Sequence, residues 1–265
     1  MFRLLQRLAN SLKKRLFNLS LRDNFNFLSQ DRQRHFEFNK ILKNNYPLNI
    51  KMELIANYAI PESLLSSLMP NDLILSGGVE FHIEFEEELN KLKNLEFHFF
   101  EVDPRSMSWF KHKFKHNNNF KLNEFGLADK NGNFDIYGDP NASWSSSISE
   151  EITTKNPLNW QKIGVAKTVK LSDYCKTNNI DSIALLKLDI EGYASKVIQD
   201  IWMNDILPKC IVFELERAVK GKFEDFKSDV QHLINLSKEK GYSTYFLPRE
   251  DSVSSFSSQF VFYKQ

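Results

Sequence analysis

Residues 185–193 read LLKLDIEGY, an apolar run that ends in two carboxylates and a glycine. The leucines predict a central strand, and the glycine allows the backbone to turn where Asp189 and Glu191 emerge. Ligands of open α/β sheets bind at the carboxyl ends of the strands, so this acid pair is a candidate site. A helix start explains the same residues, with Asp189 as its cap and Glu191 near its positive end.

The composition is that of a globular protein without a strong charge bias. The chain has 265 residues, of which 42% are hydrophobic, and it carries 35 basic and 34 acidic residues. This balance provides no overall field for a polyanion, so nucleic acid is not an expected partner. Cys175 and Cys210 lack the spacing of a metal site and indicate two free thiols in a reducing compartment. His112 and His116 are interpreted as surface residues, and no metal site is predicted.

Apolar runs alternate with helical patterns in the central part of the chain. Strands are predicted at residues 73–75, 96–102, 121–127, 168–171, 185–188 and 209–216. Helices are predicted at residues 61–69, 84–95, 106–116, 173–177 (capped by Ser172) and 224–240, with another that ends at 202. This alternation predicts right-handed βαβ units and an α/β fold, with a mostly parallel sheet and helices on both faces.

Two other stretches extend this sheet. Strands at 242–247 and 259–263 have no helix between them, so they should form an antiparallel hairpin at its edge. A shorter strand at 134–137 follows a glycine turn and reads as a hairpin-like extension. Residues 138–165 have few periodic signals. Their serine cluster, which includes Ser147, is interpreted either as a mobile loop over a site or as a plain surface loop.

Residues 1–54 are predicted to form an N-terminal helical extension to a domain at 55–265. Within it, residues 2–19 place leucines at helical spacing among basic residues, and a second helix is expected at 31–42. Three interpretations of 2–19 remain: a helix that caps the domain, a basic amphipathic helix on an anionic membrane, or an organellar targeting peptide. The expected location is the cytoplasm, with peripheral membrane contact through this helix as an alternative.

Several motifs occur in an order that resembles the FkbM-like methyltransferases, over roughly residues 55–263. The most specific are LILSGGVEFHIEFEEEL, FHFFEVDP, GLADKNG, LLKLDIEGY and IVFELE. The resemblance implies a Rossmann-like methyltransferase sheet with S-adenosylmethionine as cofactor. It also implies methylation of a hydroxyl on a sugar or secondary metabolite. The predicted antiparallel ending distinguishes this sheet from the dehydrogenase type.

The resemblance implies a set of cofactor-binding residues. After the first strand, glycines would let the backbone approach the methionine end of the cofactor, and Glu80, where related chains often have a small residue, would bind its amino group or crowd the pocket. Asp103 is expected to bind the ribose hydroxyls, or else to cap the next helix. Asp129 would accept from the adenine amine. The full predicted cofactor set is Ser76, Gly77, Gly78, Glu80, Asp103, Ala128 and Asp129.

A mechanism follows from the acids at the strand ends. Asp189 is proposed as the base that takes the acceptor proton, or as the group that orients the acceptor, with Glu191 beside it. The predicted substrate-binding residues are Lys187, Glu214 and Ser147. Two other functions remain open. One is a non-catalytic glycan-binding module on this fold, and the other is a nicotinamide-dependent oxidoreductase, which the incomplete glycine spacing disfavours.

Overall fold

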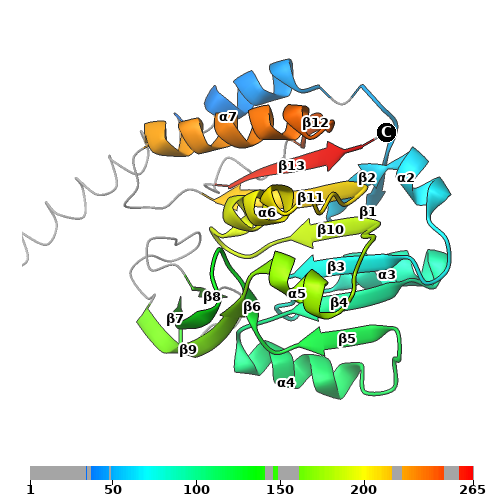
Figure 1. Ribbon diagram of the computed structural model, residues 1–265, viewed down its shortest axis with the longest axis vertical. Helices are drawn as coiled ribbons and strands as arrows, with labels where there is room; N and C mark the ends of the chain where they lie inside the picture. The colour runs from blue at the N-terminus through cyan, green and yellow to red at the C-terminus, as the bar shows by residue number, and fades with distance from the viewer. Residues whose placement is uncertain are drawn as a thin grey trace, which may run out of the picture.

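A computed structural model of the protein has one large sheet at its centre (Figure 1). It describes residues 34, 37–47, 49–140, 146–148, 161–216, 223–247 and 257–264. Within these residues the large sheet has seven strands, in the order β12-β13-β11-β10-β3-β4-β5. Their bounds are β3 (Leu73–Gly77), β4 (Glu96–Phe100), β5 (Phe120–Asn123), β10 (Leu185–Leu188), β11 (Cys210–Glu216), β12 (Ser243–Leu247) and β13 (Ser257–Tyr263).

The directions of these strands confirm the predicted α/β fold. From β5 to β11, neighbouring strands pair in parallel. β13 is antiparallel to both β11 and β12, and it lies between them. The C-terminal hairpin therefore forms the antiparallel edge, as expected for the Rossmann-like methyltransferase sheet.

The two central strands, β3 and β10, bring two loops together. All of β10 is buried, as are the last four residues of β3, and strands buried on both faces read as continuous apolar runs. In their register Leu188 lies opposite Gly77. The segments that begin at Gly78 and Asp189 therefore leave the sheet side by side, at its carboxyl edge.

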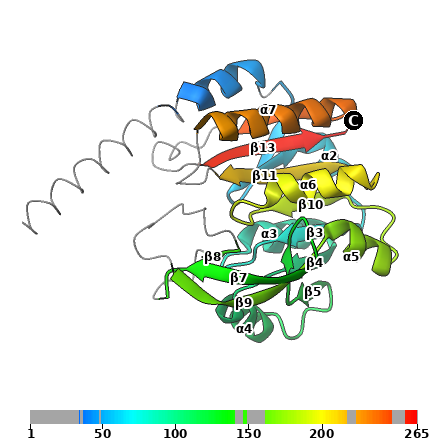
Figure 2. The same ribbon diagram turned by 60° about the vertical axis from the view of Figure 1, so that its left-hand side comes forward.

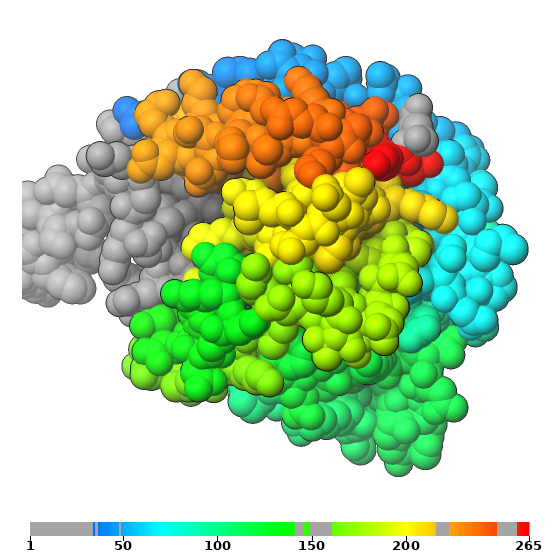
Figure 3. Space-filling view, in the orientation of Figure 1, coloured from blue at the N-terminus to red at the C-terminus, as the bar shows by residue number. Residues whose placement is uncertain are grey.

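Helices cover both faces of the large sheet. One core contains α5 (Leu171–Thr177), α6 (Ala194–Met203), α7 (Phe223–Glu239) and the helical residues 37–45. The other contains α2 (Glu62–Ser67), α3 (Glu84–Lys93) and α4 (Pro104–Lys113). In the space-filling view, α6 and α7 lie side by side on the first face (Figure 3). The predicted layering is confirmed.

A short hairpin precedes the large sheet. β1 (Met52–Ile55) pairs antiparallel with β2 (Tyr58–Pro61). Buried residues of both strands, among them Ile55 and Ile60, belong to the same core as α3. The predicted domain boundary, between residues 54 and 55, falls within β1.

A second sheet stands where one strand, a hairpin extension and a loop were predicted. Within the described residues its strands follow the order β6-β9-β7-β8: β6 (Gly126–Leu127), β7 (Gly132–Gly138), β8 (Ser146–Ser147) and β9 (Gln161–Val169). The single strand predicted at 121–127 is wrong, because β5 pairs with β4 while β6 pairs with β9. Residues 161–165 of the predicted loop belong to β9, which pairs with β7. Figure 2 shows this sheet beside the carboxyl edge of the large one.

Two helix starts also differ from the prediction. α5 begins at Leu171, and Ser172 donates from its amide and its hydroxyl to the buried Asp200 carboxylate instead of capping the helix. α4 begins at Pro104 because Asp103 is its N-cap. It ends at Lys113, so His112 and His116, both exposed, do not share one helix.

The predicted basic helix at residues 2–19 lies outside the described residues, as does most of the serine-rich loop. Of the second predicted helix, residues 37–42 are helical, and the helix continues to 45. Among the described helices, none has the length and apolar character needed to cross a membrane.

Candidate active site

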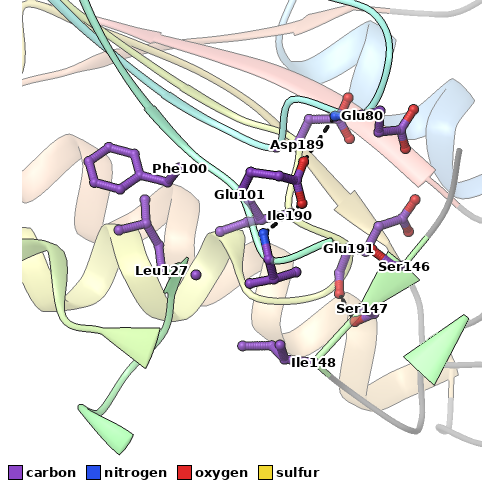
Figure 4. A pocket seen from close by; sticks show the side chains of 13 residues that line it. Glu80, Phe100, Glu101, Leu127, Ser146, Ser147, Ile148, Asp189, Ile190 and Glu191 are labelled. Carbon is purple, nitrogen blue, oxygen red and sulfur yellow. Dashed lines mark hydrogen bonds between the residues drawn. The ribbon is translucent and has the colours of Figure 1, made fainter. Parts of the chain in front are cut away.

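A pocket opens at the carboxyl edge of the large sheet, facing β8 of the second sheet. The space between its walls, which is open to solvent, is about 480 Å³. The apolar side chains in its wall include Phe100, Val102, Leu127, Ile148 and Ile190. The acidic ones are Glu80, Glu101, Asp189 and Glu191 (Figure 4). The pocket thus combines an apolar wall with several carboxylates.

The predicted site residues divide into two groups. Those that line the pocket are Gly78, Glu80, Ser147, Asp189 and Glu191. Those absent from its described lining are Ser76, Gly77, Asp103, Ala128, Asp129, Lys187 and Glu214. The pocket thus brings together two strand-end acids, one glycine, Glu80 and Ser147, and the roles predicted for all of these residues stay predictions.

The contact between Gly78 and Asp189 joins the two central loops. Gly78 has a φ of +83°, and a Cβ at this position would lie 1.9 Å from the Asp189 carbonyl oxygen. The Asp189 amide donates to the Gly77 carbonyl at 3.0 Å. The packing of one loop on the other therefore requires a glycine here, and the predicted approach of the cofactor to this loop stays a prediction.

Two non-glycine residues of the pocket have left-handed backbones. Glu80 has a φ of 45° and Glu191 a φ of 39°. Such conformations cost of order 1–3 kcal/mol each and cluster at functional sites. Both residues follow strand ends of the large sheet, so the strain lies in the loops that shape the pocket.

Asp103 does not lie in the pocket wall. It is buried, caps α4 by accepting from the Arg105 amide at 2.8 Å, and receives three further bonds from the Arg105 guanidinium. The ribose-binding role predicted for Asp103 is therefore not supported, because its carboxylate serves the helix cap and an ion pair.

Glu101 is a buried acid of the pocket, as is Glu191, and it was not among the predicted site residues. One carboxylate oxygen accepts from the Val79 and Glu80 amides at 3.0 Å, and the other from the Val102 and Asp103 amides at 2.6 and 2.8 Å. Burial raises the pKa of this carboxyl, and the amide donors lower it in part. Glu101 thus ties the loop after β3 to the end of β4.

Lys187 lies beneath the pocket and not in its wall. It is 3% exposed, and its Nζ lies 3.6 Å from Glu86 Oε1 and 3.3 Å from the Gly78 carbonyl oxygen. Ser76 donates to the same Glu86 oxygen. Burial lowers the pKa of Lys187, but the surrounding carboxylates, first Glu86 and then Asp189, raise it overall. Lys187 and Ser76 therefore belong to a buried ion cluster that supports the loops, and the substrate and cofactor contacts predicted for them stay predictions.

Three other predicted residues lie outside the described pocket wall. Asp129 is exposed and lies 3.8 Å from Lys196. Ala128 is buried, and its amide donates to the Val169 carbonyl. Glu214 is buried in β11, where Gln259 of β13 is a neighbour at 3.5 Å. The adenine role of Asp129 and the substrate role of Glu214 stay predictions.

Ser147 connects the second sheet to the pocket. Its hydroxyl donates to the Glu191 carbonyl oxygen at 2.6 Å, and the side chain is buried (Figure 4). Through this bond, β8 holds the strained loop that carries Glu191.

Replacing Ser147 with alanine should lower the free energy of unfolding by about 1 kcal/mol, because one buried hydrogen bond is lost. Chemical denaturation measures this change. Ser67→Ala is the matched control, since the Ser67 hydroxyl donates to the Leu64 carbonyl within its own helix and away from the pocket. Equal stability of the wild type and Ser147→Ala would contradict a role for β8 in holding the loop.

Comparison with known families decides the identity of the chain. A profile of the methyltransferase FkbM domain matches residues 76–244, more than half of the 265 residues. The chain belongs to the FkbM methyltransferase family. It is thus a methyltransferase that depends on S-adenosylmethionine, and the nicotinamide-dependent alternative is set aside. A search of curated proteins found no match.

Solved structures with a similar fold include other methyltransferases. Methyltransferase FkbM from Methylobacillus flagellatus is 10% identical with a TM-score of 0.46, over 73% of this chain and 44% of that one. An rRNA methylase from Streptococcus thermophilus is 9% identical with a TM-score of 0.44, over 76% and 91%. Aeropyrum pernix fibrillarin with bound S-adenosylmethionine is 7% identical with a TM-score of 0.41, over 74% and 67%. The chain spans less than half the length of the Methylobacillus protein.

The pocket of this FkbM methyltransferase fits S-adenosylmethionine in its chemistry. The aliphatic side chains of Leu127 and Ile190 would offer an apolar surface to the adenine ring. The carboxylates of Glu80 and Glu191 have the charge opposite to the sulfonium and amino groups of the cofactor. The buried carboxylate of Glu101 already accepts from four backbone amides, so it would act by holding the two loops that surround the cofactor.

Asp103 and Glu101 provide a matched pair of alanine variants in this FkbM methyltransferase. Asp103→Ala should cost about 0.5–2 kcal/mol of stability through the lost helix cap, with unchanged affinity for S-adenosylhomocysteine. Glu101→Ala should weaken that affinity at least tenfold, because hydrogen bonds to a charged group contribute about 1.5–3 kcal/mol each and both pocket loops lose their anchor. Calorimetric titration of the two variants measures the contrast. Weaker binding by Asp103→Ala, with unchanged binding by Glu101→Ala, would instead support the predicted role of Asp103 in binding the ribose.

Proposed function

We propose that the protein transfers a methyl group from S-adenosylmethionine to a hydroxyl of a sugar, glycan or secondary metabolite. The observation that carries the proposal is the position of the Asp189 carboxylate, in the pocket wall where the two central strands end. A base in this position is adjacent to the loop expected to hold the methionine end of the cofactor. Several acids in the wall suit a polyhydroxylated acceptor better than an anionic one.

The residues of the chain supply alignment and proton transfer. When bound, S-adenosylmethionine supplies a methyl group activated by a positively charged sulfur. The acceptor hydroxyl must be held in line and must lose its proton as the new bond forms. Asp189 takes that proton or orients the hydroxyl, and Glu191 holds a further hydroxyl. The aliphatic side chain of Ile148 would limit the access of water to the pocket.

The two cysteines support a cytoplasmic location for this reaction. Cys175 and Cys210 are free thiols, which are characteristic of a reducing compartment. Burial raises the pKa of the Cys175 thiol to about 12, and it raises that of Cys210 as well. Neither thiol is therefore suited to act as a nucleophile, which leaves the acids of the pocket as the reactive groups.

A transfer assay tests this proposal. The protein is incubated with S-adenosylmethionine labelled in its methyl group and a panel of nucleotide sugars and glycan fragments, with an unmethylated ribosomal RNA transcript as a further acceptor. We expect label on a hydroxyl of a sugar-containing small molecule. Label on the RNA alone would overturn the proposed acceptor class. Cofactor binding without label on any acceptor would favour the non-catalytic glycan-binding alternative.

A further inference from the structure

Tyr58 contacts the proposed base from outside the region that defines the family. It belongs to β2, ahead of the matched residues 76–244, and it is 2% exposed. Its hydroxyl donates to Asp189 Oδ2 at 2.6 Å, across 131 residues of sequence. In the described part of the chain, no second side chain hydrogen-bonds to the Asp189 carboxylate.

The hairpin that carries Tyr58 is anchored on both sides. At its tip, the Ala56 amide donates to Glu88 Oε2 of α3 at 3.1 Å. Ile55 and Ile60 are buried in the core next to it. A phenol hydroxyl on such a fixed element has little freedom to leave its acceptor, so the hydrogen bond to Asp189 is held by the fold.

The ring of Tyr58 is fixed as well. It packs edge-on against Phe85 with ring centroids 5.3 Å apart, and Lys187 Nζ lies 5.0 Å from its centroid. Glu86 in turn lies 3.6 Å from Lys187 Nζ. A buried cation over a phenol ring is attracted by the ring face and makes the hydroxyl a stronger donor. The buried ion cluster therefore reaches Asp189 through Tyr58.

We propose that Tyr58 is a positioning residue of the methyl-transfer reaction. Its hydroxyl holds Asp189 Oδ2, which leaves Oδ1 as the oxygen that receives the acceptor proton. A carboxylate has acceptor positions on both oxygens, so one can be held while the other reacts. This inference rests on the proposed role of Asp189. It makes the β1–β2 hairpin a part of the site, although residues 52–61 precede the matched domain.

The test compares Tyr58→Phe with Tyr242→Phe. Both variants remove one buried hydroxyl and keep the ring. The Tyr242 hydroxyl donates to the Pro208 carbonyl oxygen at 2.7 Å, before β11 and thus at the opposite edge of the sheet. The first readout needs no acceptor: crystal structures of both variants with S-adenosylhomocysteine. We expect the Asp189 side chain to leave its wild-type rotamer only in Tyr58→Phe, and a single unchanged rotamer there would overturn the proposal.

The second readout is the rate of methyl transfer. Tyr58→Phe should lower kcat between ten- and a hundredfold at unchanged affinity for S-adenosylhomocysteine, because a small misplacement of a reacting group can cost about a hundredfold. In an Asp189→Asn background the same change should have no further effect, since no base remains to be positioned. Additive losses would show a purely structural role. Failure of the wild type to bind S-adenosylhomocysteine would instead refute the proposed function itself.

Discussion

Replacing Gly78 with alanine is expected to destabilise the protein by at least ~3 kcal/mol, although it adds one methyl group. A non-glycine residue in the left-handed region costs about 1–3 kcal/mol, and the backbone here has a φ of +83°. The added Cβ would also lie 1.9 Å from the Asp189 carbonyl oxygen. Since neither loop can move without leaving its strand, we expect chemical denaturation to show a large loss of stability. Binding of S-adenosylhomocysteine should weaken as well.

Gly132→Ala is the matched control for this change. Gly132 lies in β7, and a Cβ there would meet nothing nearer than Phe134 Cε2 at 3.7 Å. We expect its stability to stay within about 0.5 kcal/mol of the wild type. If Gly78→Ala proved as stable as this control, the junction of the two loops would not be the contact that holds the pocket together.

The second large effect is expected in catalysis. Asp189→Asn should lower the turnover of the acceptor found in the transfer assay by about 10²–10⁴-fold, the usual contribution of a general base. The amide has the shape of the carboxylate and still accepts from the Tyr58 hydroxyl, so affinity for S-adenosylhomocysteine should not change. Steady-state kinetics and calorimetry on one preparation measure the two quantities.

Asp181→Asn makes the same chemical change on an exposed residue ahead of the other end of β10. Its turnover should equal that of the wild type. A wild-type rate for Asp189→Asn would mean that Asp189 only shapes the turn after β10, and the base would have to be sought elsewhere in the pocket.

The large sheet could be predicted because its central strands are buried on both faces. Residues 185–188 and 210–216 are mostly apolar, and such a run can be recognised in the sequence without knowledge of the tertiary contacts. The second sheet gave no such signal. β6 has only two residues, and β9 is largely half-buried or exposed, so neither shows a hydrophobic pattern. The pairing of β9 with β6 and with β7 depends on contacts that a local pattern does not contain.

The candidate site was predicted in part for a similar reason. Acids directly after a buried strand, such as Asp189, stand out in sequence. Glu101 and Asp103 are only two residues apart, and the choice between them depends on the helix start. Pro104 was the available signal, because proline at the first helical position marks the preceding Asp103 as the cap. No sequence pattern pointed to Tyr58, because its hydrogen bond to Asp189 forms only in the folded chain.

Calorimetric titration of the full-length protein with S-adenosylhomocysteine tests the central claim most directly. The claim is that the pocket between the ends of β3, β4 and β10 binds the cofactor and that Asp189 acts on the acceptor. It predicts one binding site per chain in the wild type, equal affinity in Asp189→Asn and a loss of at least tenfold in Glu101→Ala. An absence of binding in the wild type, or full affinity in Glu101→Ala, would contradict it.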